Sequence, residues 1–197
     1  FVMDLGYFLY NIVTFLAFPF IGSTIGTHRR YRAGFFQRMG FIPRQIRAQL
    51  KGSRPIWLHA VSVGEVTASI PIIKKIKEKY PQLKVVISTI TTTGNYTVRK
   101  KIPEADLVIY FPYDYFFIVN RVISIINPCI FIHTETEIWP NFLWALDRCG
   151  IPSVIVNGRI SLDSCRRYKL FGWFFKKVFN KISAFGMQSK IDYNRVI

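Results

Sequence analysis

Cysteine is scarce in this chain. Its 197 residues include 3 cysteines, and their positions show no paired spacing. This excludes a disulfide framework or a zinc site built on cysteine pairs, and it favours a reducing compartment. Cys129 and Cys149 fall in apolar stretches, so we expect both to pack as small hydrophobic side chains.

Acidic side chains are scarce as well. The chain has 11 acidic residues against 27 lysines and arginines, a formal net charge of +16, and no acidic residue lies between Asp4 and Glu65. The balance predicts an anionic partner, either a phosphate-rich substrate, an acidic lipid or a nucleic acid. A second basic run, interleaved with aromatic residues, suits a lipid headgroup interface or a single-stranded nucleic acid, with a solvated helix face as the alternative. The two runs contain Arg29, Arg30, Arg32, Arg38, Arg44, Arg47, Lys51 and Arg54, and then Arg159, Arg166, Arg167, Lys169, Lys176, Lys177 and Lys181.

The chain also lacks glycine-rich nucleotide-binding loops. Neither G-x-G-x-x-G nor a P-loop is present, so neither a dinucleotide nor a nucleoside triphosphate is the expected ligand of this part. The length is sufficient for one sizeable core. Because the sequence opens at Phe1 and stops at Ile197, directly after a strand-like run, we expect a longer protein with a second domain.

Charge is absent from residues 5–27, which are rich in Phe, Leu, Ile and Tyr. About 20 such residues span a bilayer core. We therefore predict a membrane anchor over residues 1–28 and a basic membrane-surface connector over 29–54. The basic residues at 28–32 predict that this flank stays in the cytoplasm. Pro19 and the glycines near it weaken a straight spanning helix, so an in-plane or half-inserted anchor is the alternative.

From residue 55 onward, strand-like and helix-like stretches alternate. Such alternation with short links predicts a Rossmann-like α/β domain over residues 55–197, with a parallel sheet and helices on both faces. The expected strands lie near 56–61, 84–90, 107–110, 129–134, 153–157 and 184–187. The expected helices lie near 65–79, 94–101, 115–126, 140–149 and 166–181.

Polar residues cluster after the ends of the expected strands. In an open parallel sheet these ends line one crevice, where ligands bind. The clusters are Ser62 to Glu65, Thr89 to Gly94, Tyr113 and Asp114, Thr134 to Asn141, Asn157 to Ser161, and Gln188 and Ser189.

Glu65 is the strongest catalytic candidate. It follows the tight Ser62-Val63-Gly64 turn and falls in the first turn of a helix, whose positive end favours the ionised carboxylate. An ionised carboxylate there can take a proton from a bound hydroxyl. The structural alternative is a capping box, because Ser62-x-x-Glu65 can satisfy free backbone donors of the helix.

The other polar positions have more than one interpretation. Glu135 and Glu137 precede a helix, where acids serve either as caps or as ligands of sugar hydroxyls or a catalytic partner. Arg159, after Asn157 and a glycine, is either solvated or a contact for an anion. His59 and His133 fall inside expected strands, and we expect both to be core residues whose hydrogen bonds are satisfied.

A set of motifs in fixed order resembles a known family. After an N-terminal anchor come His-Ala-Val-Ser-Val-Gly-Glu at 59–65, Thr-Thr-Thr-Gly at 91–94, Phe-Pro-Tyr-Asp at 111–114, Glu-Thr-Glu-Ile-Trp-Pro-Asn at 135–141, and Asn-Gly-Arg-Ile-Ser at 157–161. Together they resemble the amino-terminal half of the Kdo transferases of lipopolysaccharide synthesis, Kdo being 3-deoxy-D-manno-octulosonic acid. The family often has Ala at the position of Gly158 and Pro at the position of Thr92, and neither difference removes a reactive group.

The resemblance implies the amino-terminal domain of a GT-B glycosyltransferase, inverting and independent of metal or other cofactor. This domain would receive the lipid A precursor at the cytoplasmic face of the bacterial inner membrane. A carboxy-terminal domain, absent from this chain, would bind CMP-Kdo. Glu65 matches the family's general base, and the expected substrate-binding residues are Ser62, Gly64, Thr93, Gly94, Glu135, Glu137, Asn157 and Arg159.

Two other functions fit parts of the sequence. One is a different membrane-associated GT-B transferase with another lipid acceptor. The other is a non-enzymatic basic module that binds a membrane or nucleic acid, which explains the charge but gives the polar crevice no role. The ordered motifs favour the Kdo transferase, with an anionic membrane and no nucleic acid among its partners.

Overall fold

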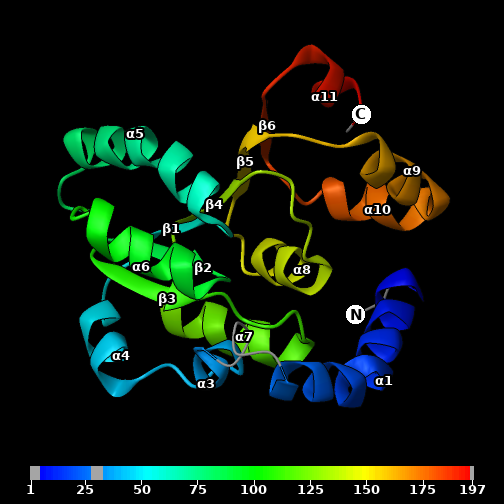
Figure 1. Cartoon of the computed structure of the whole chain (residues 1–197), viewed down its shortest axis with the longest axis horizontal. Helices are drawn as coiled ribbons and strands as arrows, with labels where there is room; N and C mark the ends of the chain where they lie inside the picture. Colours follow the sequence, from blue (N-terminus) through cyan, green and yellow to red (C-terminus); the bar gives the residue numbers. More distant parts are fainter. Residues whose placement is uncertain (1–4, 28–32, 196–197) are drawn as a thin grey trace.

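A single parallel sheet forms the centre of the molecule (Figure 1). The computed structural model describes residues 5–27 and 33–195, with the backbone alone for 19–27. The order of the six strands is β3-β2-β1-β4-β5-β6, and every neighbouring pair is parallel. The strands are β1 (Ile56–His59), β2 (Val85–Thr89), β3 (Leu107–Tyr110), β4 (Ile130–Thr134), β5 (Ser153–Gly158) and β6 (Ala184–Met187). The predicted Rossmann-like sheet is therefore confirmed, and its order reverses between β1 and β4.

Helices cover both faces of the sheet, as predicted. On one face, α5 (Val63–Lys79) and α6 (Thr92–Lys101) bury apolar side chains against β1, β2 and β3. On the other face lie α7 (Phe116–Ile126) and α8 (Pro140–Arg148). Successive side chains of a strand point to opposite faces of the sheet. Helices that are apolar on one side bury both sets of side chains when they cover both faces.

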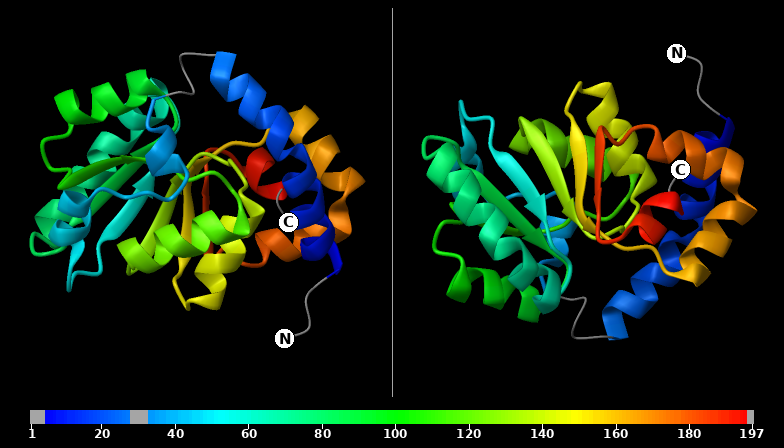
Figure 2. Two further views of the ribbon diagram at one scale, coloured as in Figure 1. Left: turned by 90° about the horizontal axis from the view of Figure 1, so that it is seen from below. Right: turned by 90° about the horizontal axis from the view of Figure 1, so that it is seen from above.

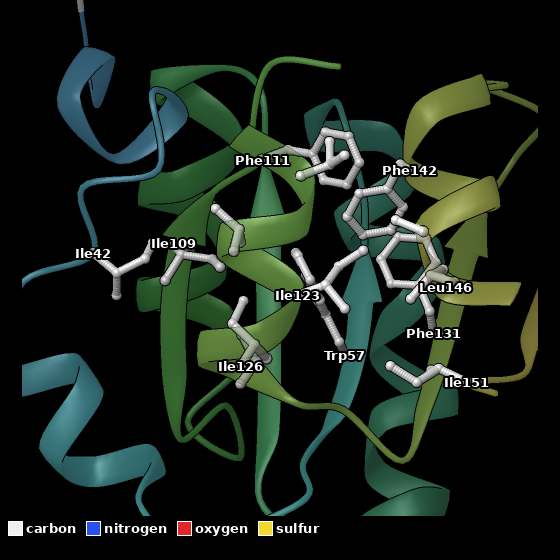
Figure 3. Close-up of a cluster of buried hydrophobic side chains, with 14 of the residues drawn as sticks. Ile42, Trp57, Ile109, Phe111, Ile123, Ile126, Phe131, Phe142, Leu146 and Ile151 are labelled. Carbon is white, nitrogen blue, oxygen red and sulfur yellow. The ribbon is translucent and has the colours of Figure 1, made fainter. Parts of the chain in front are cut away.

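The core under α7 and α8 is aromatic. Trp57, Phe131 and Phe142 meet edge-to-face, with the Trp57 ring centroid 5.2 and 5.1 Å from those of Phe131 and Phe142 (Figure 3). His59 and His133 lie at the edge of this cluster, and burial lowers the pKa of each to about 3, so both are neutral. The expectation that both lie in the core is confirmed. The expectation that their hydrogen bonds are satisfied is wrong, because His59 Nε2 and both ring nitrogens of His133 have no partner among the described residues.

The chain after β5 departs from expectation. One helix was expected over 166–181, but the structure has α9 (Leu162–Leu170) and α10 (Gly172–Phe179), followed by α11 (Lys190–Asn194) after β6. The break is at Phe171, whose backbone leaves the helical region at φ −117° and ψ 39°. It allows α10 to bury Phe174 and Val178 against β5 and α8, which a straight helix continuing α9 would not do.

The cysteines are also a partial correction. Cys129 is half-buried at the margin of the core beneath α5, in agreement with its expected packing role. Cys149 is exposed, so the expectation that it packs as a core side chain is wrong. Its position as the C-cap of α8 places it just beyond the last buried turn of that helix.

The apolar segment at the start of the chain is helical. Helix α1 (Leu5–Thr27) packs against α8 and α10, with the ring centroid of Tyr7 4.7 Å from that of Trp144 and the centroid of Tyr10 5.7 Å from that of Phe174. Both views of Figure 2 show α1 beside the α9–α10 pair. In the part of the chain that the structure describes, no helix has both the length and the apolar character that crossing a bilayer requires. The basic flank expected at 28–32 lies outside the described residues.

Part of the basic connector is built into the domain. Its helices are α3 (Phe35–Arg38) and α4 (Arg44–Leu50). Leu50 joins the core under α7, and the Arg38 side chain is buried, with its guanidinium 4.3 Å from the centroid of the Tyr113 ring. The exposed basic side chains of α4 remain on the surface.

Candidate functional site

Two carboxylate-bearing segments face each other where the strand order reverses. Glu65 follows β1, and the loop 135–139 follows β4, the neighbour of β1 in the sheet. The Thr134 hydroxyl donates to the carbonyl of His59 at 2.8 Å and joins the two strand ends. Ligands of open α/β sheets bind at the carboxyl ends of the strands at this switch point. The topology thus brings together residues that the sequence holds about 70 positions apart.

Glu65 is held by the turn that precedes it. Its carboxylate accepts hydrogen bonds from the Val61 N–H at 2.8 Å, the Ser62 hydroxyl at 2.8 Å and the Ser62 N–H at 3.2 Å. The Glu65 N–H in turn donates to Ser62 Oγ at 3.4 Å, so the predicted capping box is present. Glu65 is 7% exposed. Burial raises the pKa of its carboxyl, the Val61 and Ser62 donors lower it, and the nearby Glu135 raises it again.

Gly64 has no side chain to cover the N-terminus of α5 beside this carboxylate. A Cβ built at Gly64 would meet, among the described residues, a single heavy atom within 4 Å, Ser62 Oγ at 3.8 Å. Its φ is not in the left-handed region, so neither packing nor backbone geometry requires a glycine here. Glycine within a helix costs free energy relative to alanine. The glycine therefore leaves open space at the N-terminus of α5, next to Glu65 in the sequence.

The loop after β4 carries the second carboxyl group of the crevice. Glu135 has a left-handed φ of 75°, and its N–H donates to the Val156 carbonyl at 3.0 Å. Burial raises the pKa of the Glu137 carboxyl to about 7, and the charge of Glu65 adds to the shift. The Trp139 side chain and the charge of Arg38 act in the opposite direction and lower this pKa. Glu137 Oε2 is buried and makes no hydrogen bond of normal geometry within the described residues. Strained backbone and unsatisfied polar atoms cluster at functional sites.

The loop after β5 joins the same rim. Asn157 is left-handed, with a φ of 56°, and its side chain is exposed, as is that of Arg159. The Thr136 hydroxyl donates to the Arg159 carbonyl, so the loops after β4 and β5 are tied together. A Cβ at Gly158 would lie 2.5 Å from Met187 Sδ and 2.8 Å from Ile155 Cγ2, so the alanine that the family often has here would require these two side chains to move.

The start of α6 supports the turn before Glu65. Thr91 Oγ1 accepts from the Gly94 N–H at 3.0 Å and contacts the Val61 carbonyl at 3.3 Å. A Cβ at Gly94 would lie 2.9 Å from that hydroxyl and 3.3 Å from that carbonyl, so the glycine permits a close contact between backbones. Thr93 is exposed at the rim. Gly94 thus shapes the crevice from below, and Thr93 is the side chain of this pair that a ligand can reach.

Arg38 was not among the residues expected in the site. Its buried guanidinium lies near enough to Glu137 to lower the pKa of that carboxyl. In the sequence it is one of many basic residues in the connector, and nothing in its spacing separates it from the exposed ones. Only the neighbouring apolar residues, Phe35 and Ile42 among them, signal that this stretch packs on the domain.

The arrangement suits proton abstraction from a hydroxyl. One carboxylate is fixed in position in a desolvated crevice, and a second carboxyl beside it has a pKa near neutrality. Helix N-termini and arginines at the rim provide positive potential for an anionic group. Among the described residues there is no group of three or more His, Cys, Asp or Glu side chains placed to hold a metal ion.

Comparison with known proteins identifies the family. The family model described as "3-Deoxy-D-manno-octulosonic-acid transferase (kdotransferase)" matches residues 33–197. The chain is 33% identical over 176 residues to the 3-deoxy-D-manno-octulosonic acid transferase of Haemophilus influenzae, covering 89% of this chain and 40% of that protein. It is 28% identical over 189 residues to the enzyme of the same name from Chlamydophila psittaci, covering 93% of this chain and 43% of that protein.

A third relative has a broader name. The bifunctional glycosyltransferase/methyltransferase of Fusobacterium nucleatum is 36% identical over 156 residues, which cover 76% of this chain and 24% of that protein. The chain therefore spans less than half the length of these relatives. The family model covers most of the chain and includes all the strands and the whole crevice, and so the chain belongs to the 3-deoxy-D-manno-octulosonic-acid (Kdo) transferase family, whose amino-terminal part it matches.

Proposed function

We propose that this chain is the acceptor-binding half of an inverting glycosyltransferase that moves Kdo from CMP-Kdo to a lipid A precursor, with Glu65 as general base. The observation that carries the proposal is the placement of Glu65, a buried carboxylate fixed by Val61 and Ser62 at the carboxyl end of β1. Two of the relatives are named as Kdo transferases, which supports the transfer of Kdo. Their greater length leaves room for a second domain, which would bind CMP-Kdo.

In the proposed reaction, a hydroxyl oxygen of the acceptor attacks the anomeric carbon of Kdo. The new bond to that carbon forms as the bond from the carbon to the CMP phosphate oxygen breaks, and CMP leaves with the electron pair. The hydroxyl proton passes to Glu65. Because attack comes from the face opposite CMP, the anomeric configuration inverts. CMP departs as a stable phosphate monoester, so basic side chains and helix termini can stabilise it without a metal or other cofactor.

The raised pKa values suit these roles. A base is most effective when its pKa lies near the working pH, and burial moves the pKa of Glu65 in that direction. Glu137 has a pKa of about 7, so near neutrality it exists in part as the protonated acid beside the Glu65 carboxylate. In that form it can donate a hydrogen bond to the acceptor sugar. Glu135, with its left-handed backbone, would shape the loop and act on Glu65 through its charge.

We also propose that the protein acts at an anionic membrane, at the cytoplasmic face of the bacterial inner membrane. Helix α1 buries Tyr7 and half-buries Tyr10 against the domain but leaves many large apolar side chains exposed, with Phe15 at 74%. Because one side of α1 packs on the domain and its other side is apolar and exposed, α1 is suited to lie in the plane of the membrane surface. Among the described side chains of α1, those of residues 5–18, the exposed large apolar ones are Leu5, Phe8, Leu9, Ile12, Val13, Phe15, Leu16 and Phe18.

The test of the catalytic proposal is Glu65→Gln in the full-length enzyme, assayed with CMP-Kdo and lipid A precursor. Glutamine keeps the volume and can still cap the helix, but it cannot take the proton. We expect kcat to fall by about 10²-fold or more, with a melting temperature within a few degrees of wild type. Glu78→Gln is the control, since Glu78 is an exposed carboxylate on the same helix. Retained turnover with reduced stability would assign Glu65 to capping alone, and the base would have to be Glu135 or Glu137.

The membrane proposal has a separate test. Val13→Ser and Phe15→Ser remove exposed apolar side chains from α1 without touching its buried face. We expect the double variant to sediment with anionic liposomes several-fold less than wild type, while Ile191→Ser, an equally exposed apolar position on α11, does not. Equal sedimentation of all three proteins would remove α1 from the membrane contact.

A further inference from the structure

The turn 111–114 is a motif for which the proposed reaction has no use. It follows β3, and its last residue, Asp114, is buried although it carries a carboxylate. Phe111 stacks on His59 with a ring centroid distance of 3.9 Å, and it contacts the tilted ring of Trp139 at a centroid distance of 5.7 Å. The turn is therefore in contact with both the β1 strand and the loop after β4.

Asp114 caps α8 from a distance. Helix α8 begins after Trp139, which offers no side-chain cap. In place of a local cap, Asp114 Oδ2 accepts from the Asn141 N–H at 3.0 Å and Asp114 Oδ1 accepts from the Phe142 N–H at 2.8 Å. The Asn141 side chain returns a hydrogen bond to the Asp114 carbonyl at 2.6 Å. The residue that ends the β3 turn thus satisfies free N–H groups at the start of α8, and this fixes the downstream end of the 135–139 loop.

The same carboxylate binds α1. The Tyr10 hydroxyl donates to Asp114 Oδ2 at 2.8 Å, across more than one hundred positions of sequence. Burial raises the pKa of Asp114 to about 6, and the donors from Tyr10, Asn141 and Phe142 oppose that shift by favouring the charged form. A buried carboxylate with several donors is sensitive to the loss of any one of them, because the charge that remains is less well compensated.

We propose that Tyr10 and Asp114 are positioning residues, which hold the loop bearing Glu135 and Glu137 in its working geometry and couple the seating of α1 to catalysis. The path is short. The Tyr10 hydroxyl fixes Asp114, Asp114 fixes the first turn of α8, and that turn fixes the end of the loop opposite Glu65. Arg38 supports the turn from the connector, since its carbonyl accepts from the Tyr113 N–H at 2.9 Å. The catalytic part of this inference rests on the proposed function, whereas the coupling between α1 and the loop does not.

The test compares Tyr10→Phe with Tyr7→Phe in the full-length enzyme. Tyr10→Phe keeps the ring that stacks on Phe174 and removes only the hydroxyl that binds Asp114. Tyr7→Phe removes a hydroxyl from the same helix while its ring stays on Trp144. Hydrogen exchange of peptides covering 135–142 reports the loop directly, and kcat together with the KM for CMP-Kdo reports its catalytic consequence.

We expect Tyr10→Phe to accelerate exchange over 135–142 by about tenfold and to lower kcat by about threefold to tenfold, with the KM for CMP-Kdo unchanged. Tyr7→Phe should leave both readouts at the wild-type level. Asp114→Asn should accelerate exchange and lower kcat more than Tyr10→Phe does. If Asp114→Asn does not fold, the comparison of Tyr10→Phe with Tyr7→Phe still tests the proposal. Wild-type exchange over 135–142 in Tyr10→Phe would overturn the coupling. Faster exchange with unchanged kcat would overturn the positioning role while leaving the general base, tested at Glu65, unaffected.

Discussion

The two walls of the crevice are built in opposite ways. On the β1 side, the Glu65 carboxylate accepts three hydrogen bonds from the backbone and side chain of its own turn, and the Thr134 hydroxyl of β4 lies 3.5 Å from its Oε2. On the β4 side, Glu137 lies in a loop that starts with a left-handed residue, and its buried Oε2 lacks a partner within the described residues. Both oxygens of Glu65 thus accept hydrogen bonds, whereas Glu137 Oε2 accepts none within the described residues.

The difference suggests a division of labour. A general base must be held at a fixed place before the substrate arrives, because reorientation during the reaction adds to the barrier. A group that binds the substrate gains more by exchanging an unsatisfied state for a satisfied one. The first description fits Glu65 and the second fits Glu137. The capping role and the catalytic role of Glu65 are also compatible, since the capping hydrogen bonds hold the proposed base in place.

The largest effect is expected from substitutions of Glu65 in the β1 wall, where two variants separate its two roles. Glu65→Ala removes both the proton acceptor and the cap, whereas Glu65→Gln removes only the acceptor. Both variants should lose about 10²-fold or more in kcat, but only the alanine variant should lose about 1 kcal/mol of unfolding free energy. Denaturant unfolding alongside turnover measures both quantities. Equal stability of the two variants would show that the capping contacts contribute nothing to the fold.

The next effect concerns the rim between the walls. Arg159 stands exposed after β5, where its loop is tied to the loop after β4. Arg159→Ala should lower kcat/KM by about tenfold, equivalent to roughly 1.4 kcal/mol of transition-state stabilisation. Arg166→Ala is the control, because Arg166 is an exposed arginine on α9. If the two variants have the same kcat/KM as wild type, Arg159 is a solvated side chain.

A smaller effect is expected at Gly64, in the β1 wall. Gly64→Ala adds a methyl group in open space at the helix terminus. We expect unfolding free energy to stay level or rise by about 0.5–1 kcal/mol, while kcat/KM falls by about threefold to tenfold because the acceptor approaches there. Thermal unfolding measures the stability of the variant, and initial rates measure its kcat/KM. A variant that is more stable and equally active would show that the bare terminus is not part of the substrate path.

A further effect tests the β4 wall by pH. The folded pKa of Glu137 is about 7, above its ordinary value of 4.5, so its stabilising contribution is complete below the ordinary value and is lost as pH rises through the folded value. Glu137→Gln removes that loss. Its melting temperature relative to wild type should therefore rise between pH 5 and pH 8. The buried histidines affect both proteins alike and cancel in the difference. A difference that is constant or falls with pH would contradict the raised pKa.

The sequence was sufficient for the architecture because each element carried its own signal. Apolar runs with turn residues between them predicted all six strands, and the Ser62–Glu65 spacing predicted a capping box that the structure contains. The split between α9 and α10 was missed because Phe171 and Gly172 continue an apparently helical pattern, and the break depends on where Phe174 finds its core.

The parts of the site that escaped prediction are those created by tertiary contact. Nothing local distinguishes Arg38 from the exposed arginines around it, and its burial follows from the docking of α3. Asp114 could be placed after a strand, but its partners Tyr10 and Asn141 lie far from it in sequence. Long-range polar pairs of this kind leave no periodicity for a pattern to detect.

The pairing of Ile56 with Ile130 has a consequence for the newly made chain. During synthesis, β1, β2 and β3 can assemble while the other edge of β1 still waits for β4. That edge consists of buried, apolar residues and carries unpaired backbone groups, which are a template for association with other chains. The feature that creates the crevice therefore leaves an open strand edge in the half-made protein, first on β1 until β4 is made and then on β4 until β5 is made.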